Sequence, residues 1–219
     1  MMRQAVIAGA TGLVGAECLN LLLDRYDAVT AFVRRSTGRT HARLLERHID
    51  FDRLGTVDIP PAAHVYCTLG TTIKAAGSQE AFHRVDFDYP KMLAERTAAA
   101  PGTRFMLISS VGANAQSKNF YLRTKGELED AVRALPIDAV HIFRPSVLVG
   151  DRKESRPGEK IGIVVTKALG PLLLGSLRKY RAMPAPVLAA AMVTAANCDV
   201  RGRFIYHYDE ILNAADATK

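Results

Sequence analysis

Short runs of β-branched and aromatic residues recur along the first two thirds of the chain, and each is followed by a segment with helical periodicity. This alternation is typical of βαβ units, in which parallel strands are joined by right-handed helical crossovers. The sequence therefore predicts an α/β fold: a doubly wound parallel sheet of the Rossmann type, with its ligand crevice at the carboxyl ends of the strands. The predicted strands are 4–8, 28–33, 64–69, 104–108 and 139–143.

The rhythm of strand and helix weakens after residue 149. We therefore predict a Rossmann core at 1–149 and a small C-terminal cap at 150–219, which packs on the core as one domain and forms the substrate region. Patterns of two apolar helical segments and a last strand remain in the cap, at 161–177, 186–196 and 203–208.

The composition excludes several function classes. A hydrophobic content of 48% and a charged content of 23% are those of an ordinary globular protein rather than a disordered one. The formal charge of +7 is compatible with nucleic acid, an acidic membrane or a phosphorylated small molecule as a partner. However, the densest basic segment, at 34–48, lacks the aromatic residues on which single-strand binders stack bases. We therefore expect a small-molecule ligand and no nucleic acid.

Apolar segments and cysteines bear on the location of the chain. The stretch at 161–177 contains a lysine and a Gly-Pro pair and falls short of the ~20 residues of a spanning helix, so no membrane span is predicted. The N-terminus lacks the basic region and long apolar segment of a signal peptide. Cys18, Cys67 and Cys198 are far apart and have no metal-ligand spacing, which favours reduced thiols. These features predict a cytoplasmic protein without a metal site.

The segment AVIAGATGLVGAECLNLLL has the pattern of a strand, a tight turn and a helix, with glycines at three-residue spacing. In this setting the first glycine allows the bend, the second lets backbone N–H groups approach a pyrophosphate, and the third lets the helix pack on the strand. A purely structural turn is the alternative. The pattern predicts a dinucleotide site formed by Gly9, Thr11, Gly12, Leu13, Val14 and Gly15.

Two arginines occupy the position that distinguishes the two nicotinamide dinucleotides. NAD-preferring sites carry Asp or Glu about 20 residues after the glycine turn to hold the ribose 2′-hydroxyl. Here the second strand ends in Phe-Val-Arg-Arg, without a carboxylate. Guanidinium groups bind phosphate through charge-assisted, often bidentate hydrogen bonds. We therefore expect NADP(H) as the cofactor, with Arg34 and Arg35 at its 2′-phosphate; a solvated basic loop is the alternative.

Two other strand ends are candidates for cofactor contacts. Asp50 and Phe51 lie where an adenine ring is expected, and the segment CTLGTT brings Leu69, Gly70 and Thr71 to the end of a strand, where backbone can run close to a dinucleotide. Ordinary loop chemistry explains either segment equally well.

The fifth predicted strand ends in two serines, and a glycine-containing loop connects it to a helix that carries Tyr121 and Lys125 one turn apart. Lys125 shares the helical stripe of Tyr121 and the apolar residues Leu128 and Val132, whereas charged residues occupy another face. An ammonium near a phenol favours the phenolate, which makes a tyrosine an efficient acid and base near neutral pH. We therefore expect Ser110, Tyr121 and Lys125 to form a catalytic set; a chance pair on a helix surface is the alternative.

The motifs GATGLVG, ISS and YLRTK, in this order, resemble the atypical branch of the short-chain dehydrogenase/reductase superfamily. The segments CTLGTT, FHRVDFDYP, SSVGANAQSKNFYLRTKGELE and RPSVLVGDRKESRPGE look like the Tat-interacting tumour-suppressor oxidoreductases and their bacterial relatives. The resemblance implies an NADPH-bound Rossmann fold with Ser110, Tyr121 and Lys125 as the catalytic set. It also implies that four consecutive residues lie beside the nicotinamide: Arg144, Pro145, Ser146 and Val147.

One position departs from the superfamily pattern. Many members carry an asparagine in the helix after the fourth strand, where it completes a proton relay. The corresponding stretch here, VDFDYP, offers Asp86. The relay of those members therefore does not transfer directly to this chain.

Two functions from different classes remain open. The first is an NADPH-dependent oxidoreductase that reduces a small carbonyl compound by hydride transfer, with Tyr121 as proton donor. The second is a non-catalytic NADPH-binding redox sensor or scaffold that acts through a protein partner. The complete set of Ser110, Tyr121 and Lys125 favours the first, because a sensor has no chemical need for all three. A monomer and a homodimer are both compatible with the sequence.

Overall fold

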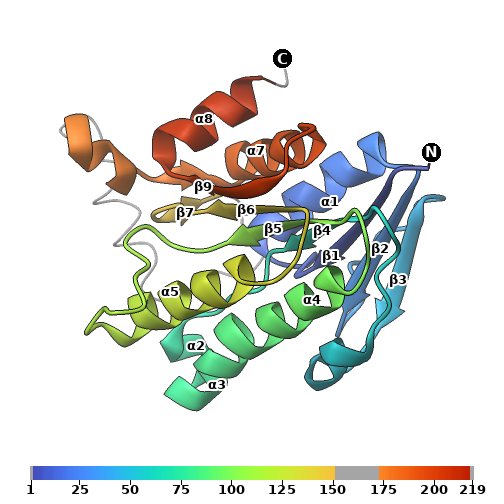
Figure 1. Cartoon of the computed structure of the whole chain (residues 1–219), viewed down its shortest axis with the longest axis horizontal. Coiled ribbons are helices and arrows are strands. Elements are labelled where there is room, and N and C mark those ends of the chain that lie inside the picture. Colours follow the sequence, from blue (N-terminus) through green and yellow to red (C-terminus); the bar gives the residue numbers. More distant parts are fainter. Residues whose placement is uncertain (1, 151–172, 218–219) are drawn as a thin grey trace.

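A single sheet of seven parallel strands forms the centre of the molecule in the computed structural model, which describes residues 2–150 and 173–217 (Figure 1). The strand order is β3-β2-β1-β4-β5-β6-β9, so the direction of winding reverses between β1 and β4. Ligands of doubly wound sheets bind at such a reversal, outside the carboxyl ends of the strands. The predicted fold class is confirmed. The strands are β1 (Gln4–Ala8), β2 (Ala28–Val33), β3 (Leu44–His48), β4 (His64–Cys67), β5 (Arg104–Ile108), β6 (Ala139–Phe143) and β9 (Gly202–Tyr206).

Helices cover both faces of this sheet. Figure 1 shows α4 (Tyr89–Ala98) and α5 (Phe120–Arg133) on one face, with α1 (Leu13–Arg25), α7 (Ala185–Asn197) and α8 (Tyr208–Asp216) on the other. The core accordingly consists of two apolar clusters, one on each side of the sheet. Shorter elements are α2 (Ile73–Ala76), α3 (Gln79–His83), the π-helical turn η2 (Arg84–Asp88), the 3-10 helices η1 (Phe51–Thr56) and η4 (Gly175–Tyr180), and the paired strands β7 (Leu148–Val149) and β8 (Met183–Pro184).

Local sequence explains where the two site-bearing helices begin. Helix α5 starts after Asn119, whose side chain accepts a hydrogen bond from the N–H of Leu122 at 3.1 Å. Such a cap stabilises a helix by about 1 kcal/mol. Helix α1 starts after Gly12 and buries the stripe of Val14, Cys18 and Leu22 against the sheet.

The described residues after 150 complete the sheet. β9 pairs in parallel with β6, and α7 is buried on most of its surface between the sheet, α1 and α8. β9 and α7 correspond to the strand expected at 203–208 and the helix expected at 186–196. The apolar segment expected at 161–177 lies largely outside the described residues. The division into a core at 1–149 and a cap at 150–219 stays a prediction.

β3 is an element that the sequence pattern did not indicate. It lies at the edge of the sheet within the basic segment 34–48, and its residues are exposed or half-buried. An edge strand has a neighbouring strand on one side only, and its side chains can remain open to solvent. It therefore does not need the continuous apolar run by which a central strand is recognised.

No helix among the described residues is long and apolar enough to cross a membrane. Within 2–150 and 173–217, no cluster of His, Cys, Asp and Glu side chains has the arrangement of a metal site. Cys18 and Cys67 are buried free thiols, and Cys198 is an exposed one.

Candidate functional site

The glycine turn joins the ends of β1 and β4 tightly. Gly9 has a φ of +96°, which favours glycine, and a Cβ built on it would lie 2.6 Å from Thr68 Oγ1. A Cβ on Gly15 would lie 2.0 Å from the carbonyl oxygen of Gly9. The N–H of Gly12 donates to that same carbonyl at 2.9 Å. Side chains at Gly9 and Gly15 are therefore excluded by the packing of the turn.

The first turn of α1 is suited to an anion. Its N-cap, Gly12, offers no side-chain cap, and the turn contains no acidic residue. Thr11 and Gly12 are exposed, Leu13 is half-buried, and Val14 is buried. Backbone N–H groups at a helix start lack intrahelical partners and carry the positive end of the helix dipole. The turn therefore offers free backbone donors and a positive potential to an anion such as a pyrophosphate.

Gly15→Ala tests the packing of this turn. The added Cβ would overlap the Gly9 carbonyl at 2.0 Å, and backbone cannot move aside as a flexible side chain does. We expect the variant to lose about 1–3 kcal/mol of unfolding free energy, measured by denaturant titration. In the control Gly55→Ala, the nearest atom to the new Cβ is Met92 Cγ at 4.0 Å. We expect this control to change stability by less than about 0.5 kcal/mol, so equal losses in both variants would contradict the close packing described here.

Arginine side chains lie beside the end of β2. Arg34 and Arg35 are exposed, and the structure shows no carboxylate partner for either one among the described residues. The guanidinium of Arg34 lies over the ring of Phe51, 5.7 Å from its centroid.

The two residues predicted at the adenine differ in their surroundings. Phe51 is buried and packs edge-on against Tyr89. Asp50 is exposed and caps η1 by accepting a hydrogen bond from the N–H of Asp52 at 3.1 Å. The structure thus brings Arg34, predicted at the 2′-phosphate, next to Phe51, predicted at the adenine.

The loop after β4 connects the glycine turn with Lys125. Thr68 lies against Gly9, and Leu69 is buried. A Cβ on Gly70 would lie 3.4 Å from Asp86 Oδ1 and 4.0 Å from Lys125 Nζ. One end of this short loop therefore packs on the glycine turn, and the other is hydrogen-bonded through Thr71 to Asp86, the partner of Lys125.

Lys125 is buried in an ion pair. Its Nζ lies 2.7 Å from Oδ1 of Asp86, and the two side chains are 4% and 0% exposed. The other carboxylate oxygen of Asp86 accepts from the N–H of Thr71 at 2.7 Å. Burial lowers the pKa of Lys125, but the carboxylate of Asp86 and the neighbouring Tyr121 raise it, and the net pKa lies above its ordinary value. Lys125 is therefore a charged ammonium at neutral pH.

The two serines after β5 point to different surroundings. Ser109 is buried and donates to Oε1 of Glu129, whereas Ser110 is half-buried and donates only a long bond of 3.3 Å to its neighbour Val111. Tyr121 is half-buried, and its ring lies 5.6 Å from that of Phe82. Ser110 rather than Ser109 is therefore the serine available to a substrate.

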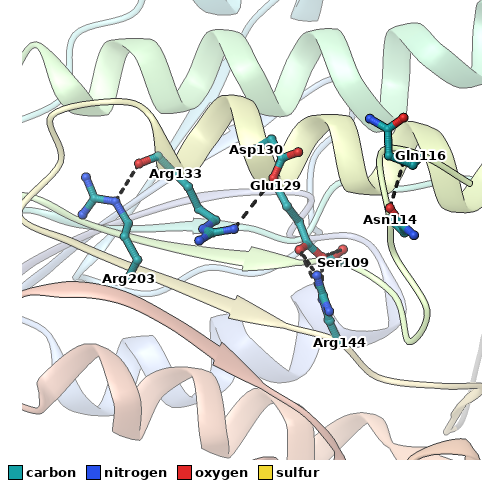
Figure 2. A network of polar contacts seen from close by, with 8 residues as sticks. All are labelled: Ser109, Asn114, Gln116, Glu129, Asp130, Arg133, Arg144 and Arg203. Carbon is teal, nitrogen blue, oxygen red and sulfur yellow. Dashed lines mark hydrogen bonds and ion pairs between the residues drawn. The ribbon is translucent and has the colours of Figure 1, made fainter.

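A buried polar network ties the ends of β5 and β6 to α5 (Figure 2). Glu129, one turn beyond Lys125, accepts from Ser109 and also pairs with Arg144, whose Nη2 and Nε lie 2.5 and 3.0 Å from its carboxylate oxygens. A hollow of about 190 Å³ opens beside Glu129 and Arg144. Sequence reasoning missed Glu129, although its spacing of four from Lys125 places it near the same helix face.

The segment after β6 is anchored on several sides. The carbonyl of Pro145 accepts from the N–H of Val111 at 2.9 Å, the hydroxyl of Ser146 donates to the carbonyl of Arg181, and Val147 is 39% exposed. Arg144 is held by Glu129 as described above. The predicted role of these four residues beside a nicotinamide stays a prediction.

Solved structures with the same architecture define the class of the fold. The chain superimposes on the Bordetella bronchiseptica enzyme WbmH, solved in complex with NAD+, with a TM-score of 0.68, 18% identity and coverage of 94% of this chain and 75% of that one. The human epimerase family protein SDR39U1, solved with NADPH, gives a TM-score of 0.64, 17% identity and coverage of 93% and 74%. The fold is thus that of the NAD(P)-binding short-chain dehydrogenase/reductase and epimerase structures.

Sequence relatives identify the family within this class. Protein HTATIP2 of Rattus norvegicus is 37% identical over 72% of this chain and 67% of its own length. The mitochondrial protein fmp52 of Emericella nidulans is 31% identical over 89% of this chain and 87% of its own length. No family model matches the chain. The chain belongs to the family of HTATIP2 and FMP52, within the atypical short-chain dehydrogenase/reductases.

The expected cytoplasmic location is contradicted by the FMP52 relatives. FMP52 proteins from Emericella nidulans, Scheffersomyces stipitis and Meyerozyma guilliermondii, at 31–32% identity, are named mitochondrial. The cysteine pattern led to the wrong expectation because reduced thiols are compatible with more than one reducing compartment.

Proposed function

We propose that the protein is an NADP(H)-dependent oxidoreductase that reduces a small carbonyl compound. The observation that carries this proposal is the position of the loop after β4: Thr68 packs on the glycine turn, and the N–H of Thr71 donates to Asp86, which pairs with Lys125. A dinucleotide on the glycine turn would therefore extend towards the helix that carries Tyr121 and Lys125. The membership of the family supports a nicotinamide cofactor.

The residues of the crevice suit the parts of NADP(H). The uncapped start of α1 would hold the pyrophosphate, Arg34 and Arg35 the 2′-phosphate, and the Phe51 region the adenine. Lys125 would hold the nicotinamide ribose through its buried ammonium. When bound, the reduced cofactor supplies a hydride.

Ser110 and Tyr121 are the chain's own groups for carbonyl chemistry. The hydroxyl of Ser110 would donate a hydrogen bond to the substrate oxygen, where negative charge develops. The phenol of Tyr121 would deliver the proton to that oxygen. The ammonium of Lys125, near Tyr121, would stabilise the phenolate left behind.

A turnover screen tests the function directly. The purified protein would be given aldehydes and ketones together with NADPH, and the loss of nicotinamide absorbance followed. We expect reduction of at least one carbonyl class. A protein that binds NADPH but reduces none of them would contradict the reductase function.

The cofactor preference makes a second test. We expect the wild type to bind NADPH more tightly than NADH. Charge-assisted contacts to the 2′-phosphate contribute about 1.5–3 kcal/mol each, so Arg34→Ala/Arg35→Ala should weaken NADPH binding at least about a hundredfold and have little effect on NADH. Fluorescence titration of both cofactors measures this. Arg39→Ala removes an exposed arginine farther along the same loop and serves as the control. Equal affinity of the wild type for both cofactors would contradict the assignment.

A non-catalytic NADPH sensor or scaffold is the second candidate. It is favoured by the pairing of Lys125 with Asp86, which compensates part of the charge that would otherwise stabilise a Tyr121 phenolate. A sensor would bind NADPH and a protein partner without any carbonyl turnover. The same screen, combined with Tyr121→Phe, separates the two functions.

A further inference from the structure

Asp86 is a fully buried carboxylate to which the proposed mechanism assigns no task. It lies in η2, a π-helical turn that interrupts the helical segment between α3 and α4. Turns of this kind are rare and frequently occur at functional sites. One of its oxygens lies 2.7 Å from Lys125 Nζ, and the other accepts from the N–H of Thr71 at 2.7 Å. The carboxylate therefore joins three separate segments at the crevice.

We propose that Asp86 is the positioning residue for Lys125: its carboxylate fixes the ammonium beside the loop after β4 and keeps it charged in the working enzyme. The inference rests on the proposed function only in giving Lys125 a part in catalysis. The contact itself is independent of any substrate.

Burial makes this counter-charge necessary. An ammonium that is 4% exposed has lost nearly all contact with water, and a buried amine without an opposite charge loses its proton. Burial indeed lowers the pKa of Lys125, and the carboxylate of Asp86 is the largest influence that raises it. Without Asp86, the pKa of Lys125 would fall, and the protonation equilibrium would shift towards the neutral amine.

Neither Cys67 nor the other carboxylates of the same two helical elements can replace Asp86 as the counter-charge of Lys125. Tyr121 on the same helix and Cys67 at the end of β4 also favour the ammonium, but burial raises the pKa of the Cys67 thiol to about 12, so it carries no charge near neutral pH. Glu129, one turn along α5, is occupied by Ser109 and Arg144. Asp88, on the same π-helical turn, is 40% exposed and lies 3.5 Å from His83 instead.

Asp86→Asn tests the proposal because it removes the charge while keeping the size of the side chain and an oxygen that can accept from Thr71. In protein labelled with ¹³C-lysine, the Cε resonance of Lys125, assigned by its absence in Lys125→Arg, reports the ionisation of the ammonium. We expect Asp86→Asn to move its titration about one to three pH units lower than in the wild type. Asp88→Asn, which removes a carboxylate two positions along the same turn, should leave the titration in place.

An unchanged Lys125 titration in folded Asp86→Asn would overturn the proposal, and so would an equal shift in Asp88→Asn. If Asp86→Asn does not fold, Asp86→Asn/Lys125→Met decides, because this double variant contains no unpaired buried charge. Recovery of folding in the double variant supports the ion pair as the reason for the failure. A double variant that also fails to fold would overturn the proposal. Asp86 would then be required for the structure of the π-helical turn and not as the counter-charge of Lys125.

The resonance titration needs neither cofactor nor turnover, so it is separable from the proposed function. A shifted Lys125 together with no carbonyl reduction would refute the reductase and leave the role of Asp86 standing. Where reduction is found, the loss of activity with rising pH should begin at lower pH in Asp86→Asn, because the ammonium is lost earlier. A pH–rate profile that is the same as in the wild type would contradict the proposal even if the reductase is real.

Discussion

Tyr121→Phe is expected to lower kcat by about 10²–10⁴ and to leave NADPH binding nearly intact. The phenolic proton matters only as charge develops on the substrate oxygen, so its loss should not weaken the ground-state complex with the cofactor. The half-buried ring packs beside Phe82, and phenylalanine keeps this contact. Steady-state kinetics on a carbonyl identified by the screen, together with fluorescence titration of NADPH, measure the two effects.

Two comparisons make the result specific to Tyr121. Tyr208→Phe removes a phenol at the start of α8, on the opposite face of the sheet from α5, and should keep wild-type turnover (Figure 1). Lys125→Ala should impair turnover and NADPH affinity together, because the same ammonium is assigned to both the phenol and the ribose. Retention of wild-type kcat by Tyr121→Phe would remove Tyr121 from the mechanism.

Glu129→Ala is expected to lower the unfolding free energy by about 3 kcal/mol. Removing one partner of a buried ion pair costs about 3–5 kcal/mol because the other charge is left without compensation. Arg144 is 20% exposed and keeps some contact with water, which places the expected loss at the lower end of this range. The buried hydroxyl of Ser109 also loses its acceptor. Denaturant unfolding followed by circular dichroism gives the value.

Glu127→Ala is the matched control for this prediction. Glu127 lies on the same helix, is 42% exposed, and faces Arg123 across 4.0 Å. Exposed pairs of this kind contribute little, so the expected loss is less than about 0.5 kcal/mol. Similar unfolding midpoints for the two variants would show that the network in Figure 2 does not stabilise the ends of β5 and β6.

Features that depend on short stretches of chain were predictable from the sequence. The glycine spacing predicted the turn because both steric requirements, the positive φ of Gly9 and the space at Gly15, belong to one strand–turn–helix unit. Helical periodicity predicted that Lys125 faces inwards, and it is 4% exposed. The parallel sheet followed from the alternation of strands and helices, since a parallel pair requires a crossover. The family resemblance was confirmed by the relatives.

The partners of the buried charges were decided by the tertiary structure alone. Asp86 meets Lys125 because a π-helical turn and α5 pack together, and Glu129 meets Ser109 and Arg144, 20 and 15 positions away, because the ends of β5 and β6 lie beside α5. Sequence periodicity reports which face of an element is buried, but not which side chain of another element it meets there. A buried ammonium stays protonated only when an opposite charge lies beside it. The charge of Lys125 therefore depends on a contact with Asp86 that only the folded chain creates.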